Sequence, residues 1–150
     1  MLRPGLQQFV EFLLKGFWVG IWSSMPERTL IPILQLVARN IHIGLEQFLF
    51  IYDRRWCSED PRIAHPYEPN HGLFVKPFTS IDVEFDRDNV ILIDETREKA
   101  EYNPPGSFIE ADGFEGDPDD RFFERLQPYL WNLYWFSGCA ADYVWENTLR

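Results

Sequence analysis

Four patterns along the chain predict helices, and in the first two the apolar residues recur at one-face helical spacing. After Pro4, which suits a first helical turn, the one-face spacing continues until Gly16 ends it. In the third pattern, Pro128 predicts a break, because proline removes a backbone donor from a helix interior. The predicted helices follow Pro4, follow Pro26, and cover residues 121–134 and 140–147.

Apolar runs between the helices predict strands and short extended segments. They are FWVGIWSS (17–24), FLFIYD (48–53), LFVKPF (73–78), VILID (90–94) and SFIEA (107–111). Because the main runs are continuous rather than alternating, they indicate a parallel sheet with helices on both faces. Residues 54–72 are rich in turn formers and are predicted to be a loop or insertion. The whole pattern predicts one α/β domain over residues 1–150.

Polar side chains stand where three of the predicted strands end. These residues are Ser23, Asp53 and Asp94. In open parallel sheets, ligands bind outside the carboxyl ends of the strands. We therefore expect a ligand site at this edge of the sheet.

The charge balance excludes one class of partner. The formal net charge is −10. A nucleic-acid or anionic-membrane surface needs a stripe of lysine and arginine, and the sequence has none. The sequence therefore predicts no nucleic-acid partner, and its acidity is that of an ordinary solvated surface or of a surface that binds basic partners.

Cysteine use and hydropathy bear on the compartment. Cys57 and Cys139 lack the spacing of a zinc site or a disulfide framework, so we expect a reducing compartment. The apolar stretch 9–22 is too short and too often interrupted by polar residues to cross a bilayer, which predicts no membrane insertion. A nuclear or cytoplasmic location is favoured, and a mitochondrial one stays open.

Asp94 and Glu95 form an acidic pair directly after an apolar run. Carboxylate oxygens at a strand end suit Mg²⁺, which is usually held by one or two carboxylates and a substrate phosphate. The alternative is structural, with Asp94 capping the turn or helix that follows, through Arg97. The spacing alone does not decide between the two.

Ser23, Ser24 and Lys76 are candidate phosphate ligands. Hydroxyl and backbone N–H groups ahead of a helix can bind a phosphate oxygen, but a serine there can equally cap the helix. Lys76 can supply a fixed cation, or it can be an ordinary exposed lysine. No histidine or cysteine has the spacing of a catalytic or metal site, and the DPDD stretch (117–120) has no buried strand before it.

Several motifs, taken in order, resemble one known family. They are RPGLQQFVEFL, VGIWSS, LFVKPF, VILIDETREKAEYNPP and the aromatic C-terminal helix. Over roughly residues 3–110, the chain resembles the haloacid-dehalogenase-type domain of the small C-terminal-domain phosphatases, the nuclear-LIM-interactor-interacting-factor-like proteins. The form IWSS is similar to plant members. The resemblance implies a haloacid-dehalogenase-like parallel sheet and a Mg²⁺-dependent phosphoprotein phosphatase.

The resemblance also implies a role for each candidate residue. Ser23, with Ser24 beside it, matches the hydroxyl that contacts the substrate phosphate. Lys76 matches the lysine that neutralises the phosphate charge. Asp94 matches the acid that holds Mg²⁺, and Glu95 takes the place of its neighbour.

The family's nucleophile motif is missing from its usual place. In the family, a buried strand ending in DxDx[TV] lies shortly upstream of RPG, but only two residues precede Arg3 here. The first aspartate of that motif is the nucleophile and the second is the general acid and base. The resemblance therefore implies an incomplete catalytic set and a sheet without its central strand. It also implies a structural turn at Asn103, and Pro77 stands where many relatives have an acid.

Three functions remain open from the sequence. The first is a phosphatase-like domain that is catalytically inactive in this form and binds a protein or a phosphopeptide. The second is a fragment of an active Mg²⁺-dependent phosphoprotein phosphatase whose nucleophile strand lies upstream. The third is a non-enzymatic interaction domain of the Tim-fifty type of mitochondrial protein import.

Overall fold

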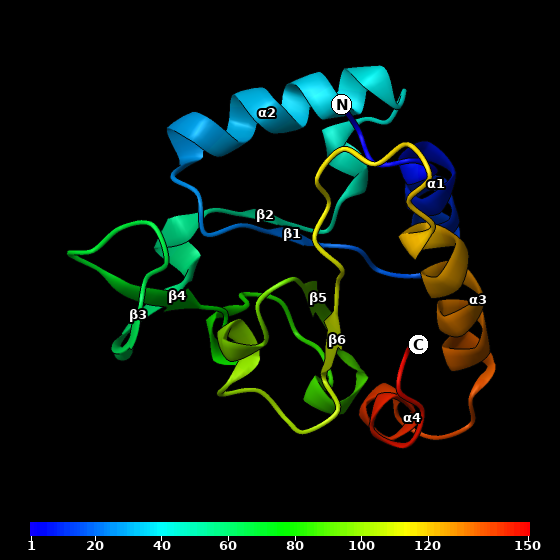
Figure 1. Cartoon of the computed structure of the whole chain (residues 1–150). Coiled ribbons are helices and arrows are strands. Elements are labelled where there is room, and N and C mark those ends of the chain that lie inside the picture. The colour runs from blue at the N-terminus through cyan, green and yellow to red at the C-terminus, as the bar shows by residue number, and fades with distance from the viewer.

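The structure is a computed structural model that describes all of residues 1–150 (Figure 1). The helices are α1 (Leu6–Gly16), α2 (Glu27–Asn40), α3 (Phe122–Trp135) and α4 (Ala140–Glu146). The strands are β1 (Ile21–Trp22), β2 (Ile51–Tyr52), β3 (Ser58–Ala64), β4 (Gly72–Val75), β5 (Leu92–Asp94) and β6 (Phe108–Glu110). None of the helices is both long enough and apolar enough to cross a membrane.

The strands form three separate two-stranded sheets. β1 pairs with β2 and β5 pairs with β6, both in parallel, while β3 and β4 are antiparallel. This mixture of helices and parallel strand pairs is compatible with the predicted α/β class. The single continuous parallel sheet expected from the apolar runs is absent, because no ladder joins β1 to β5. In Figure 1 the helices α1 and α3 pack together at one end of the molecule, and the β3–β4 hairpin lies at the other.

The turn before α1 is built from the RPG sequence. Gly5 has a φ of 77°, a left-handed conformation that favours glycine, and its carbonyl accepts the N–H of Phe9 at 2.9 Å. The guanidinium of Arg3 donates two hydrogen bonds of 2.8 Å to the carboxylate of Asp120. It also lies 4.4 Å from the centre of the Phe122 ring. The RPG turn therefore ties the start of α1 to the start of α3.

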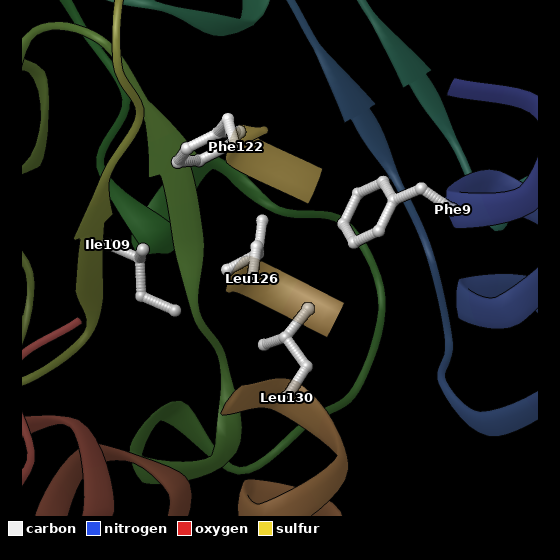
Figure 2. Close-up of a cluster of buried hydrophobic side chains, with 5 residues drawn as sticks. All are labelled: Phe9, Ile109, Phe122, Leu126 and Leu130. Atoms are coloured by element: carbon white, nitrogen blue, oxygen red, sulfur yellow. The ribbon is translucent and has the colours of Figure 1, made fainter. Parts of the chain in front are cut away.

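The main apolar core lies between α1, α3 and β6 (Figure 2). Its buried members are Phe9, Ile109, Phe122, Leu126 and Leu130. In Figure 2, Phe9 of α1 points toward Leu126 and Leu130 of α3, and Ile109 of β6 lies on their other side. Ile93 of β5 also packs against this cluster. The core therefore fixes the β5–β6 pair to the helices.

α3 passes through Pro128 without ending, so the break predicted there is wrong. Proline does remove one N–H from the helix ladder. However, Leu126 and Leu130 on either side of it are buried in the core, and this packing holds the helix together. Tertiary contacts thus override a local helix-breaking signal.

Residues 54–72 are more ordered than their turn-forming composition indicates. β3 lies within this segment, and Asp60 of β3 pairs with Leu73 of β4. The guanidinium of Arg54 donates two hydrogen bonds, of 3.1 and 2.9 Å, to the carboxylate of Glu68. The ladder and this ion pair hold both ends of the segment in place.

β1 and β5 are only half-buried, although the predicted sheet with helices on both faces would bury its strands. Every residue of these two strands has intermediate exposure, whereas all four residues of β4 are buried. Each of the two strands has a ladder partner on one side only. The other edge lacks a covering neighbour, and this explains the exposure.

Truncation of Leu126, which is fully buried, tests the core. We expect Leu126→Ala to lower the free energy of unfolding by about 2–5 kcal/mol, because a cavity remains in the core. Leu36→Ala, at a position of α2 that is 59% exposed, should change it by no more than about 0.5 kcal/mol. Urea denaturation followed by circular dichroism measures both, and equal effects would contradict this placement of the core.

Acid is expected to weaken the link between Arg3 and Asp120. The hydrogen bonds from Arg3 lower the pKa of Asp120 to about 2. A carboxyl group with a lowered pKa stabilises the fold above its unfolded pKa, and the stabilisation is lost as the pH falls toward its folded pKa. The melting temperature of the wild-type chain should therefore fall more steeply than that of Asp120→Asn between about pH 4 and pH 2. Parallel curves for the two proteins would count against this role of Asp120.

Candidate functional site

The carboxyl ends of β1 and β5 meet at the side chain of Lys76. Its ammonium group donates to the backbone oxygen of Trp22, the last residue of β1, at 2.7 Å. It also donates to Oδ2 of Asp94, the last residue of β5, at 2.5 Å. Only 4% of the Lys76 side chain is exposed. Lys76 is therefore a buried link between the two parallel strand pairs and not an ordinary exposed lysine.

The backbone of Lys76 is held by the segment that follows β5. Its N–H donates to the carbonyl of Lys99 at 2.7 Å, and its carbonyl accepts from Nδ2 of Asn103 at 2.9 Å. Oδ1 of Asn103 accepts the N–H of Phe78 at 2.8 Å. The turn expected at Asn103 thus clamps the loop after β4 and positions the lysine.

Asp94 faces two cations. Its Oδ2 accepts from Lys76, and its Oδ1 lies 3.4 Å from Nζ of Lys99. Burial alone would raise the pKa of Asp94, but the ammonium of Lys76 lowers the pKa below its ordinary value, with Lys99 adding to the effect. Oδ1 also accepts the N–H of Thr96 at 3.0 Å. The carboxylate therefore caps its turn through Thr96 and not through Arg97.

Ser23 and Ser24 lie at the carboxyl end of β1, as expected from the sequence. The Oγ of Ser23 accepts the N–H of Met25 at 3.1 Å, which is the capping interaction of the structural alternative. The carbonyl of Ser24 accepts from Nε of Arg54 at 2.7 Å. These bonds leave the O–H of Ser23 able to donate to a ligand, and a role for either serine in phosphate binding stays a prediction.

The other acids at strand ends form no ion pair with Lys76. Glu95 is exposed, and Asp53 is paired with Arg55 through hydrogen bonds of 3.0 and 2.8 Å. No three acidic, histidine or cysteine side chains are clustered in a way that could hold a metal ion. Since the oxygens of Asp94 are already engaged, this arrangement offers Mg²⁺ a poor set of donors. Magnesium binding by Asp94 and Glu95 stays a prediction.

One acidic stretch formally matches the family's nucleophile pattern, although no motif above includes it. Residues 86–90 read DRDNV and formally fit DxDx[TV]. Asp86 and Asp88 are exposed, and the Asp86 carboxylate accepts the N–H of Asp88 at 3.1 Å in a short turn before β5. This turn lies at the amino end of β5, whereas Asp94 lies at its carboxyl end, so the stretch is not part of the site.

The structure brings in residues that no motif indicates. Sγ of Cys57 lies 3.7 Å from the carbonyl oxygen of Ser23. Burial raises the pKa of the Cys57 thiol, although nearby Lys76 partly opposes this. Nε1 of the Trp22 indole is buried without a hydrogen-bond partner. Lys99 and Cys57 reach the site from turns, and turns carry no periodic signal that would reveal them.

The Lys76–Asp94 pair can be tested by a double-mutant cycle. Lys76→Met and Asp94→Asn should each lower the free energy of unfolding by roughly 3–5 kcal/mol, because each removes one member of a buried, hydrogen-bonded ion pair. The double variant should lose clearly less than the sum of the two.

Arg97→Met is the matched control, because it removes an exposed ion pair with Glu110. We expect it to change the stability by less than about 1 kcal/mol. Urea denaturation of all four variants measures the coupling. Additive losses at Lys76 and Asp94 would show that the two side chains do not depend on each other.

A comparison with protein families gives one match. A family model described as NLI interacting factor-like phosphatase matches residues 1–140, which include the whole site. No match was found among curated proteins.

Proposed function

The chain belongs to the NLI interacting factor-like phosphatase family, and on this basis we propose that its polar site binds a phosphorylated protein segment without hydrolysing it. The phosphate would lie at the carboxyl ends of β1 and β5. Lys76 would contact it together with the hydroxyl groups of Ser23 and Ser24.

The buried ammonium of Lys76 is the observation that carries this proposal. A fixed cation at the carboxyl ends of parallel strands is suited to an anion, and Lys99 adds a second positive charge within 3.4 Å of Asp94. One carboxylate balances only one of the two ammonium groups. Burial lowers the pKa of Lys76, and Asp94 opposes this effect. With both ammonium groups charged, the site holds one more positive than negative charge in a chain whose net charge is −10.

Hydrolysis would require groups that these residues do not supply. Phosphoester cleavage in this family's chemistry needs a carboxylate nucleophile and a general acid. Asp94 is the one carboxylate bonded to Lys76, and its oxygens are occupied by Lys76 and Thr96. Within this proposal, the nucleophile of the haloacid-dehalogenase-like sheet would stand between β1 and β5, and no strand of residues 1–150 pairs with the second edge of β1 or of β5.

Calorimetric titration with a phosphoserine peptide tests the binding. We expect Lys76→Met to weaken binding at least tenfold, because one charge-assisted hydrogen bond to phosphate is worth about 1.5–3 kcal/mol. Lys15→Met, at an exposed lysine of α1, is the matched control and should bind like wild type. Equal affinity for the phosphorylated and unphosphorylated peptides would overturn the proposal.

Phosphate release from the same peptide tests the absence of hydrolysis. The chain should release no phosphate above background, with or without Mg²⁺. Magnesium-dependent turnover that disappears in Asp94→Asn would show instead that these residues form a working phosphatase. Magnesium binding by Asp94 and Glu95 would then be required, and an Asp94→Asn variant would lose it.

A further inference from the structure

We propose that a pocket beside β6 and α4 binds a free α-amino acid with an aromatic side chain. The pocket has a volume of about 520 Å³ and is lined by the turn after β5, by β6 and by the C-terminal helix α4 (Figure 1). Volumes of this size are typical of small-molecule sites. Lys76 and Ser23 do not line it, so this inference goes beyond phosphate binding and does not depend on it.

The walls of the pocket are held in place at both ends of α4. Gly106, in the turn before β6, has a φ of 78°, and a Cβ atom there would collide with the backbone oxygen of Ala141. At the other end of α4, the hydroxyl of Tyr129 donates to the carbonyl of Asn147. Burial raises the pKa of Tyr129 to about 12, so this hydroxyl keeps its proton at neutral pH. The pocket is therefore formed without a ligand.

Opposite charges lie side by side in the pocket. Nη2 of Arg97 lies 2.7 Å from Oε2 of Glu110, and the two side chains are 68% and 54% exposed. Exposed ion pairs contribute little to stability, so a ligand can open this pair at small cost. A ligand with both a carboxylate and an ammonium group would give each side chain a new partner. The carboxylate of Glu101, which also lines the pocket, would add to the attraction for the ammonium group.

Ser107 adds a buried hydroxyl to the lining. Only 1% of this residue is exposed. Its N–H donates to the carbonyl of Pro104 at 3.2 Å, and its carbonyl accepts the N–H of Leu92 at 2.8 Å. The hydroxyl forms no hydrogen bond with another residue, and a buried polar group is stabilised when it gains a partner. A ligand carboxylate bound by Arg97 would provide an acceptor for it.

Aromatic rings define the rest of the ligand. The guanidinium carbon of Arg97 lies 5.3 Å from the centre of the Phe108 ring, which holds the cation over the ring. Trp145 also lines the pocket and is 71% exposed, although Ala140 and Ala141 of the same helix are buried. An aromatic side chain would cover the exposed indole, because aromatic rings pair favourably. A free aromatic amino acid thus matches the charges, the hydroxyl and the ring surface together.

An NMR titration of the complete, isotope-labelled chain with L-phenylalanine tests the proposal. The amide signals of Ser107 and Phe108 and the indole signal of Trp145 should shift and saturate. L-phenylalanine amide lacks the carboxylate, and N-acetyl-L-phenylalanine lacks the ammonium group. We expect each to bind about tenfold more weakly, because each loses a charge-assisted hydrogen bond. Equal affinity for the three compounds, no saturation, or shifts only outside the pocket would overturn the proposal.

Variants assign each charge to its partner. Arg97→Met should weaken the binding of L-phenylalanine about tenfold and bind the free acid and the amide equally, because the cation that distinguishes them is gone. Glu110→Gln should reduce the preference over N-acetyl-L-phenylalanine in the same way. Arg87→Met, at an exposed arginine outside the pocket, is the matched control and should bind like wild type. If Arg97→Met still prefers the free acid as wild type does, the carboxylate is not bound by Arg97 and the proposal fails.

Discussion

The geometry of the polar site depends on the buried ammonium of Lys76. This one group binds the last backbone carbonyl of β1 and the last side chain of β5, and no ladder joins those strands. A buried charge is costly to remove from water unless it is paired and hydrogen-bonded. The carbonyl of Trp22 and the carboxylate of Asp94 meet that requirement. Each strand pair thus supplies part of the environment that the lysine needs.

The surroundings of Lys76 are as important as its charge. Asn103 holds the loop after β4, from Lys76 to Phe78, through two side-chain hydrogen bonds, and Lys99 supplies both a backbone acceptor and a second ammonium group. The resulting site contains the ammonium groups of Lys76 and Lys99 and one carboxylate, that of Asp94, which is already hydrogen-bonded. Under the proposed function, this site binds an anion and does not carry out phosphoryl transfer, which needs a free carboxylate nucleophile.

The parts of the fold that the sequence predicts well are those set by local pattern. α1 begins after RPG and ends at Gly16, and the acid at the end of VILID does lie at the carboxyl end of a parallel strand. These features depend on glycine geometry and on apolar periodicity, and both can be read from neighbouring residues. The family suggested by the motifs is also the one whose model matches the chain.

What the sequence does not predict depends on distant contacts. Pro128 fails to break α3 because the core on either side of it supplies the stability. β1 and β5 are less buried than the predicted sheet requires. A continuous apolar run shows that a strand can be buried, but it does not specify which element covers the strand. Lys99 and Cys57 escape notice because they reach the site from turns. The link between Lys76 and Trp22 uses a backbone oxygen, which carries no sequence signal.

A carbon NMR titration of the Asp94 carboxyl group tests the central claim most directly. If Lys76 is the anion-binding cation, the pKa of Asp94 should lie below its ordinary value. Inorganic phosphate should then move the pKa of Asp94 upward, because a second anion competes for the same ammonium. A pKa of Asp94 at or above its ordinary value that phosphate does not change would contradict the account.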